Sequence, residues 1–305
     1  MFGQARDAAA RNGHAACSGC SLCLLVCPTW RATHDPRMTP EGRAKALQHG
    51  ATPVDVRASA EACTLCGACE PVCPERIDLV GLTLDLRRRL ADDEAVVAMR
   101  GAMESRIPSP ATSAKSVFLA GPGLRSKPDA LKRVARLVGG TVGEDGGEDL
   151  LEAIRAGVPI PERRLEGFLA ALRPAKTLIV DDGLWLRHLR AWLPGVRVVG
   201  AGEVLSGLNS VRSALRKTDL YVIEPRAYHD DYERLVRHYD RLRAERECAF
   251  NLDLQRIAIP PAGQAGWILK GRRIERVVVE RDEDAGDFLR LGAHPVVHVA
   301  ELADH

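Results

Sequence analysis

The cysteines of this chain are the feature that most constrains what it can fold into. Nine cysteines occur in 305 residues, and eight of them lie in two runs within the first quarter of the chain. Both runs have the spacing C-x2-C-x2-C-x3-C-P: Cys17, Cys20, Cys23, Cys27 and Pro28, then Cys63, Cys66, Cys69, Cys73 and Pro74. Because the number of cysteines is odd and residues 1–7 contain no apolar export signal, we do not expect a disulfide framework.

This spacing is typical of bacterial-type [4Fe–4S] ligation. Three thiolates at three-residue intervals on a winding loop can each reach one iron of a cubane, while inward N–H groups hydrogen-bond the sulfurs. The fourth iron needs a more distant ligand, which in two-cluster ferredoxins is the last cysteine of the opposite run. We therefore predict two [4Fe–4S] clusters, the first held by Cys17, Cys20, Cys23 and Cys73 and the second by Cys63, Cys66, Cys69 and Cys27.

Two other uses of the cysteines fit the pattern less well. Structural zinc usually takes C-x2-C pairs, which leaves a regular triplet followed by Cys-Pro unexplained. Redox thiols without a metal fit the pattern less well still. The ninth cysteine, Cys248, stands alone and is expected to be a small apolar residue or an unreactive thiol.

Composition excludes some classes of function. The 43 basic and 41 acidic side chains give a net charge of +2, which does not favour a nucleic-acid binder. Aromatic residues make up 4% of the chain, which disfavours recognition of bases or sugars by stacking. No apolar run is long enough for a membrane span. We expect a cytoplasmic globular protein.

The rest of the chain divides at a linker rich in proline and serine. We expect a first domain at 1–107, with a short helix from Pro40 and an apolar helical period over 77–103, then a linker at 108–115. From 116 to 305, strands alternate with helices in two halves that resemble one another, at 116–205 and 215–305. The predicted strands are 117–120, 177–180, 196–199, 220–223, 256–259, 277–280 and 296–299, and the predicted helices are 129–137, 184–192 and 231–247.

No catalytic constellation is evident in this second part. Gly121-x-Gly123 lacks the third glycine of a dinucleotide fingerprint and is interpreted as a turn. The acidic stretch 144–149 is interpreted as a solvated loop, and Arg87-Arg88-Arg89 as a solvated helix face. The polar residues His229, Asp230, Asp231 and His238 are expected on a solvated helix surface.

Three stretches carry a resemblance to a known group: 17–30, 63–74 and Pro40-Glu41-Gly42-Arg43. With them, the first hundred residues resemble the α-helical dicluster ferredoxin domain of the heterodisulfide reductase C subunit. The same domain occurs in iron–sulfur subunits of glycolate oxidase, lactate-utilisation systems and anaerobic glycerol-3-phosphate dehydrogenase. The resemblance implies an α-helical dicluster ferredoxin domain followed by an α/β domain of two similar halves.

In that group the second domain, of the heterodisulfide reductase B type, carries Cys-Cys-Gly motifs. The present chain has Asp181-Asp182-Gly183, 221–228 and 261–266 where such cysteine-containing turns would fall, so it resembles a cysteine-depleted version. A third cluster or disulfide cleavage in this part is therefore not expected.

The resemblance implies an electron-transfer subunit of an oxidoreductase complex. Its two clusters would relay single electrons between a partner, expected to be a flavoprotein, and a downstream acceptor. An alternative is an iron–sulfur enzyme whose α/β domain itself binds a small substrate or a flavin. A regulatory protein is a third interpretation, but the sequence has no basic recognition helix.

Overall fold

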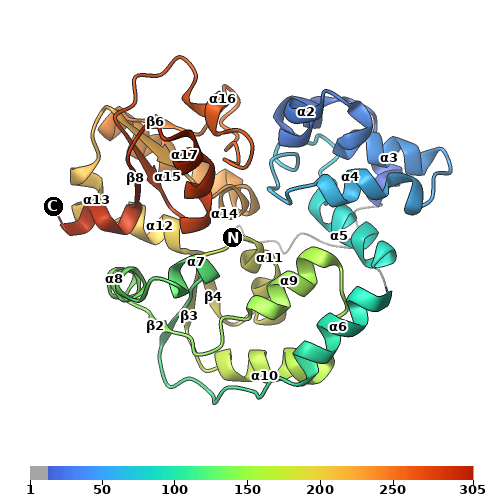
Figure 1. Ribbon diagram of the computed structural model, residues 1–305, viewed down its shortest axis with the longest axis horizontal. Coiled ribbons are helices and arrows are strands. Elements are labelled where there is room, and N and C mark those ends of the chain that lie inside the picture. The colour runs from blue at the N-terminus through green and yellow to red at the C-terminus, as the bar shows by residue number, and fades with distance from the viewer. Residues whose placement is uncertain (1–12, 92, 305) are drawn as a thin grey trace. The chain divides into compact units, whose positions relative to one another are not determined.

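The computed structural model describes residues 13–91 and 93–304 (Figure 1). The expectation that residues 1–7 carry no export signal concerns residues outside this range. The chain forms two compact units, which are described separately below. Unit 1 comprises Met1–Ile107 and Asp149–Glu166, and unit 2 comprises Pro108–Glu148 and Gly167–His305.

The described part of unit 1 consists of helices and loops. Its elements are η2 (Gly13–Ala16), α1 (Leu22–Val26), α2 (Pro28–Thr33), η3 (Pro36–Met38), α3 (Pro40–Gln48), η4 (Val54–Val56), α4 (Arg57–Ala62), α5 (Leu79–Leu90), α6 (Asp93–Glu104), α9 (Glu148–Ala156) and the start of α10 (Glu162–Leu172). The segment 77–103, predicted to be helical, contains two helices, α5 and α6. Its apolar period forms the buried face of α5, where Leu86 and Leu90 pack against Val56 and Ala60.

Capping residues define where two of these helices begin. Thr39 precedes α3, and its hydroxyl accepts a hydrogen bond from the Gly42 N–H at 3.1 Å. Asp78 precedes α5, and its carboxylate accepts one from the Gly81 N–H at 2.8 Å. Each cap satisfies a backbone donor that has no partner inside the helix, so both helices start at fixed positions beside the cysteine runs.

The segment Asp149–Glu166 belongs to unit 1 although it is far along the chain. Arg164 forms a two-pronged ion pair with Asp149, at 2.7 Å for both contacts. The Arg155 carbonyl accepts a hydrogen bond from Arg87 on α5 at 2.8 Å. This segment therefore packs on the helices that surround the cysteines, a role that its sequence did not indicate.

Unit 2 is an α/β structure with two four-stranded parallel sheets (Figure 1). The first has the order β2-β1-β3-β4 and the second the order β6-β5-β7-β8. Their strands are β1 (Ser116–Leu119), β2 (Thr141–Val142), β3 (Thr177–Val180), β4 (Arg197–Gly200), β5 (Asp219–Val222), β6 (Ala249–Phe250), β7 (Arg276–Val279) and β8 (Val296–His298). Short apolar runs form these strands because the central strands of a parallel sheet are covered on both faces.

Six of the seven predicted strands are present within a residue or two of their predicted bounds. The prediction for 256–259 is wrong: this segment forms an isolated antiparallel bridge between Leu252 and Ala258, and Arg256 has a φ of 63°. The two-residue strands β2 and β6 were not predicted, because two residues are too few to show an alternation.

The helices of unit 2 cover the sheets. They are α7 (Pro122–Arg125), α8 (Pro128–Val138), α11 (Leu184–Trp192), α12 (Ala201–Ser206), α13 (Asn209–Ala214), α14 (Pro225–Asp230), α15 (Tyr232–Arg246), α16 (Ala265–Leu269) and α17 (Gly286–Leu291), with the 3-10 turns η5 (Asp282–Ala285) and η6 (Val299–Asp304). Cys248 lies buried in an apolar cluster of this unit that also contains Phe250 and Tyr239.

Two polar segments of unit 2 are less solvated than expected. His229 is fully buried, and its Nε2 accepts a hydrogen bond from the Ala258 N–H at 3.1 Å. Asp145, in the acidic stretch interpreted as a solvated loop, is also buried and accepts one from the Gly147 N–H at 2.9 Å. Gly147 lies against the rings of Phe168 and Trp185, so packing of the loop on these rings removes Asp145 from water.

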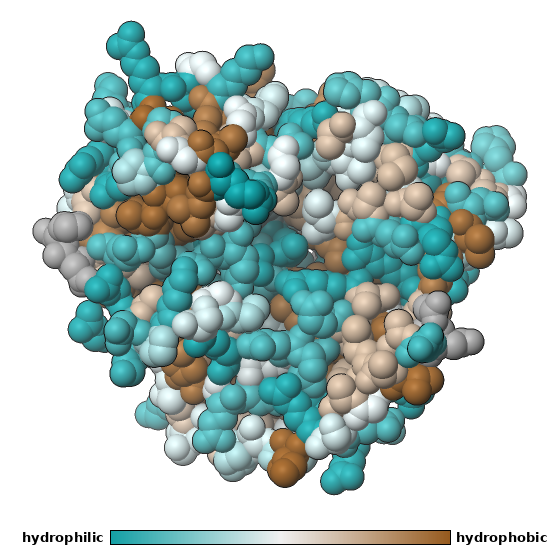
Figure 2. All heavy atoms as spheres, in the orientation of Figure 1, coloured by the Kyte–Doolittle hydropathy of each residue, from teal (hydrophilic) through white to brown (hydrophobic). Residues whose placement is uncertain are grey.

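In the described part of the chain, no helix is long and apolar enough to cross a membrane. Figure 2 shows polar side chains over much of the visible face, with apolar ones in scattered groups.

Candidate iron–sulfur site

The two cysteine loops of unit 1 share a backbone conformation. In the first loop, Gly19 and Ser21 have φ values of 79° and 61°; in the second, Leu65 and Gly67 have 55° and 75°. These residues occupy equivalent places in the two runs, two after the first cysteine and one after the second. Left-handed residues at the same places turn both loops in the same way. Glycine stands at the first of these places in the first loop and at the second in the second loop. The repeat is therefore structural as well as sequential.

The first predicted ligand set surrounds a pocket in unit 1. Cys17, Cys20, Cys23 and Cys73 all line it, together with Ser18, Ser21, Pro40, Glu41, Glu75, Ile77 and Leu79. Three of the four cysteines come from the first run and one from the end of the second. Cys20 is exposed and Cys23 is buried, so one side of the pocket is close to solvent.

The second predicted set is more enclosed. Cys27 and Cys66 are buried, and Cys63 and Cys69 are partly buried. After burial, the charges of Cys63 and Cys27 contribute to the raised pKa of Cys66, and Cys27 also acts on Cys23, so Cys27 is within electrostatic range of both loops. Pro28 follows Cys27 at the first position of α2, as its missing N–H favours.

Burial determines the ionisation of these thiols. It raises the pKa of Cys23 to about 12, that of Cys66 to about 11, and that of Cys69 well above its usual value. Backbone N–H groups of Glu41 and Ala68 oppose the shift at Cys23 and Cys66 by hydrogen-bonding the sulfur. In the absence of iron these three thiols are therefore neutral at pH 7, and metal binding must displace their protons.

The donor set fits iron–sulfur clusters. In residues 13–91 and 93–304, no three histidine, cysteine or acidic side chains converge on a position for one metal ion. A backbone N–H is directed at the sulfur of Cys23 in the first run and at that of Cys66 in the second, as [4Fe–4S] ligation favours.

Polar side chains of α3 hold the first cysteine loop in place. The Lys45 ammonium donates to the Cys17 carbonyl at 2.9 Å. The Gln48 amide donates to the same carbonyl at 2.9 Å and to the His14 carbonyl at 2.8 Å. Neither residue was identified from the sequence, since lysine and glutamine on a short helix give no signal of such a role.

Two arginines have a similar role around the second loop. Arg43, from the Pro-Glu-Gly-Arg stretch, is buried and bonds to Ser59 and Thr83. Arg87 is half-buried and donates to the Cys63 carbonyl at 2.6 Å, so it is not part of a solvated face as the sequence suggested. Arg88 and Arg89 are exposed, as expected.

In unit 2, buried carboxylates and arginines lie where the strands end. Asp182 follows β3 and pairs with Arg281 at 3.0 Å and with Arg226 at 3.3 Å. Glu224 follows β5, and one of its oxygens accepts from the Ala227 N–H at 2.6 Å. Ligands of α/β proteins usually bind at this edge, but here the polar groups bind mainly one another.

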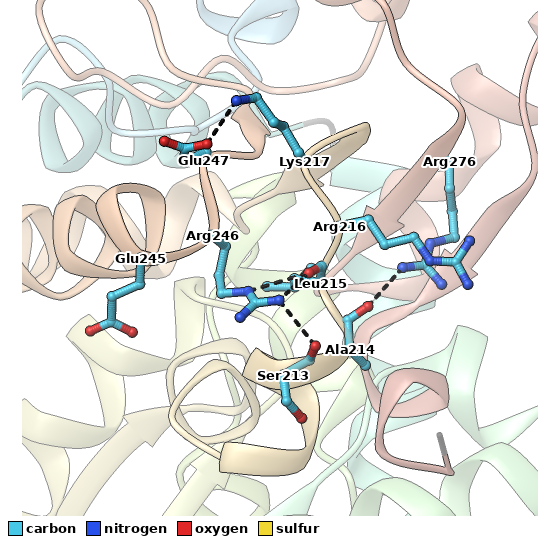
Figure 3. Close-up of a pocket in the computed structure, with 9 residues that line it drawn as sticks. All are labelled: Ser213, Ala214, Leu215, Arg216, Lys217, Glu245, Arg246, Glu247 and Arg276. Carbon is cyan, nitrogen blue, oxygen red and sulfur yellow. Dashed lines mark hydrogen bonds and ion pairs between the residues drawn. The ribbon is translucent and has the colours of Figure 1, made fainter.

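The open pocket in Figure 3 lies at the opposite, amino-terminal ends of β5 and β7. Three of its basic side chains have protein partners: Lys217 pairs with Glu247 at 2.7 Å, and Arg246 donates to the Leu215 carbonyl at 2.7 Å. Arg276, at the start of β7, pairs with Asp219 at 2.7 Å. These contacts join loops to strands, and we assign the pocket no ligand.

Comparisons with known proteins bear on the N-terminal part of the chain. Comparison with curated proteins and with solved structures finds no match. Residues 13–77, which contain both cysteine runs, match the family model of the 4Fe-4S dicluster domain. This part of the chain is therefore an iron–sulfur, ferredoxin-like domain with the capacity for electron transfer.

Proposed function

We propose that the chain is an electron-transfer subunit of an oxidoreductase complex. It would relay single electrons through two [4Fe–4S] clusters between a partner, which we propose to be a flavoprotein, and a downstream acceptor. When bound, each cluster supplies a one-electron couple. The chain's own contribution is to supply eight thiolates, to direct backbone N–H groups at sulfur and to exclude water from the buried ligands.

One observation carries the proposal: the pocket lined by Cys17, Cys20 and Cys23 also contains Cys73 from the other run. This grouping supports crossed ligation, with Cys63, Cys66, Cys69 and Cys27 as the second set. Crossed ligation places two clusters in one small domain as neighbours, as a relay requires.

The resemblance to heterodisulfide reductase-like subunits extends the proposal to the rest of the chain. We propose a dicluster domain at 1–107, a linker at 108–115 and an α/β domain at 116–305 made of two similar halves. The identical form of the strand orders β2-β1-β3-β4 and β6-β5-β7-β8 supports two related halves. Eight ligand thiols suit a reducing compartment such as the cytoplasm.

Metal analysis tests the cluster content. Protein purified anaerobically is expected to contain about eight irons and about eight sulfides per chain, as two cubanes require. Cys248→Ser is the matched control and should leave both values unchanged, since Cys248 lies in the core of unit 2. Zinc in place of iron, with no visible absorption, would contradict the proposal.

Double variants test the crossing. Cys20→Ala is expected to leave about four irons per chain, by loss of one cubane. If ligation is crossed, adding Cys73→Ala should remove little more iron, because both residues hold the same cluster. Adding Cys27→Ala instead should remove the rest. If adding Cys27→Ala removes little more iron and adding Cys73→Ala removes the rest, each run holds its own cluster.

Copurification tests the subunit role. The proposal expects the chain to isolate as a stable complex with a flavin-containing protein and to be inactive alone. Turnover by the isolated chain with an artificial electron acceptor would instead favour an iron–sulfur enzyme.

A further inference from the structure

Two arginine side chains in unit 1 lie beside the second cysteine run without a carboxylate partner. The Arg43 side chain is 2% exposed; its Nη atoms donate to Ser59 and Thr83 at 3.0 and 3.1 Å, and its Nε has no partner. Arg87 donates to the carbonyls of Ala60 and Cys63 at 2.9 and 2.6 Å. Among the described residues, neither guanidinium forms an ion pair.

Arg87 is electrostatically close to a predicted ligand and to Arg43. Burial lowers the pKa of Arg87, the charge of Cys63 opposes this effect, and the charge of Arg43 adds to it. Glu61 also acts on Arg87, but its side chain is 57% exposed and pairs with Arg57. Water screens an exposed carboxylate, so it compensates a buried cation weakly.

Uncompensated buried charge is costly, since neutral acceptors recover only part of the lost hydration. A [4Fe–4S] cluster with four thiolate ligands is an anion and becomes more negative on reduction. It is therefore the counter-charge that the surroundings of Arg43 and Arg87 lack, and these cations stabilise the reduced state more than the oxidised one.

The balance of charge differs between the two sites. Near the second, Glu70 is the opposing carboxylate: its Oε1 accepts from the Val80 N–H at 3.0 Å, and its charge contributes, after burial, to the raised pKa of Cys69. Near the first, Glu41 and Glu75 line the pocket. The neighbouring cation there is Lys45, bound to the Cys17 carbonyl at 2.9 Å.

We propose that Arg87, with Arg43 behind it, raises the midpoint potential of the cluster held by Cys63, Cys66, Cys69 and Cys27 above that of the other cluster. The inference rests on the proposed function, because it requires both clusters. At partial reduction the electron then resides mainly at the second site, so the chain transfers electrons preferentially from the first site to the second.

A redox titration of the full chain with dithionite, monitored by electron paramagnetic resonance, tests the proposal. In Arg87→Gln, the ratio of reduced to oxidised second cluster at a fixed potential is expected to fall about tenfold, which is about 59 mV for one electron. The midpoint potential of the first cluster should not change.

Arg87→Lys keeps the charge and should restore most of the potential of the second cluster. Arg88→Gln is the matched control, since the exposed Arg88 pairs with Asp85 at 3.7 Å and should have no effect.

Two further variants make the result decisive. Cys20→Ala removes the first cluster and so assigns the remaining signal to the second. Glu70→Gln keeps the acceptor for Val80 but removes the opposing charge, so it should raise the same potential; it also serves if Arg87→Gln fails to fold.

An unchanged potential in Arg87→Gln at full iron content would overturn the inference. Equal shifts in Arg87→Gln and Arg87→Lys would also overturn it, because they would mean that hydrogen bonding of the loop matters and charge does not. Wild-type protein without clusters would refute the proposed function instead, and iron analysis separates the two cases.

Discussion

Single carboxyl groups in unit 2 have unusual ionisation because of where they lie. Asp181 follows β3; its Oδ2 accepts from the Gly121 N–H at 3.0 Å, while Oδ1 is buried without a partner. Burial and, to a smaller extent, the charge of Glu283 raise the pKa of Asp181 to about 7, although Arg281 opposes the shift. Burial likewise raises the pKa of Glu224 to about 8 and that of Glu280 to about 7.

These shifts predict that unit 2 loses stability as the pH rises. When the folded-state pKa is raised, the folded state retains a proton that the unfolded state has released. The stabilisation is complete below the unfolded pKa, near 4, and is lost as the pH rises towards the folded pKa of about 7 to 8. Each such group contributes a slope of up to about 1.4 kcal/mol per pH unit in this window.

Asp181→Asn tests this at one residue. The amide cannot ionise but can still accept from Gly121, so the variant should match wild type near pH 4 and be more stable at pH 8, by about 4 kcal/mol. Urea unfolding at both pH values, followed by tryptophan fluorescence, measures the difference. Asp253→Asn is the control, since Asp253 lies outside this set of buried carboxyl groups and its Oδ1 accepts from the N–H groups of Gln255 and Ile257. Parallel pH profiles for wild type and Asp181→Asn would contradict the argument.

The same residues mark the limit of sequence interpretation at this scale. Cysteine identity and spacing were informative because few chemistries use that pattern. The polar stretches 87–89, 144–149 and 229–231 were interpreted as solvated, and this was wrong for Arg87, Asp145 and His229. Their burial results from packing against elements far along the chain, which local composition does not record.

Among the elements, α5 and the segment after α9 approach each other more closely than side chains would allow. Gly157 has a φ of 78°, and a Cβ there would lie 2.4 Å from the backbone of both Arg87 and Arg88. The close approach allows the Arg155 carbonyl to accept from Arg87. A glycine at this place is therefore required by contact as well as by conformation.

Gly157→Ala is predicted to destabilise unit 1 by about 3 kcal/mol, from the steric clash together with the left-handed conformation. Gly50→Ala is the control: Gly50 also has a positive φ, 90°, but its Cβ would meet nothing within 4 Å. It should cost about 1 kcal/mol, for conformation alone. Urea unfolding of both variants provides the comparison. Equal losses would mean that the contact with α5 is not important.

Element type was easier to predict than tertiary placement. The 3.6-residue period predicted α5 and the apolar runs predicted the longer strands, because those patterns are local. The docking of Asp149–Glu166 on unit 1 depends on contacts such as Arg164 with Asp149, which no local pattern announces.

At the scale of the whole molecule, the question is how much chain the clusters need. The sequence suggests that 1–107 is sufficient, since it contains every predicted ligand. Unit 1 also includes Asp149–Glu166, which supplies the Arg155 carbonyl to Arg87 and the Asp149 carboxylate to Arg106, at 2.8 and 3.6 Å. Since Arg87 also bonds to the Cys63 carbonyl, this distant segment supports the second cysteine loop.

A fragment that ends at Ile107 is therefore predicted to lose iron faster than the full chain. A hydrogen bond to a charged group contributes roughly 1.5–3 kcal/mol, so loss of the Arg155 contact should speed iron release to a chelator about tenfold. The full chain with Gly157→Ala, which disturbs the same contact while retaining every residue of unit 2, should release iron at an intermediate rate. Fading of the visible absorption after addition of the chelator measures all three rates. Equal rates for the fragment and the full chain would show that residues 1–107 hold the clusters without Asp149–Glu166, because the support of Arg87 would then come entirely from α4 and the second cysteine loop.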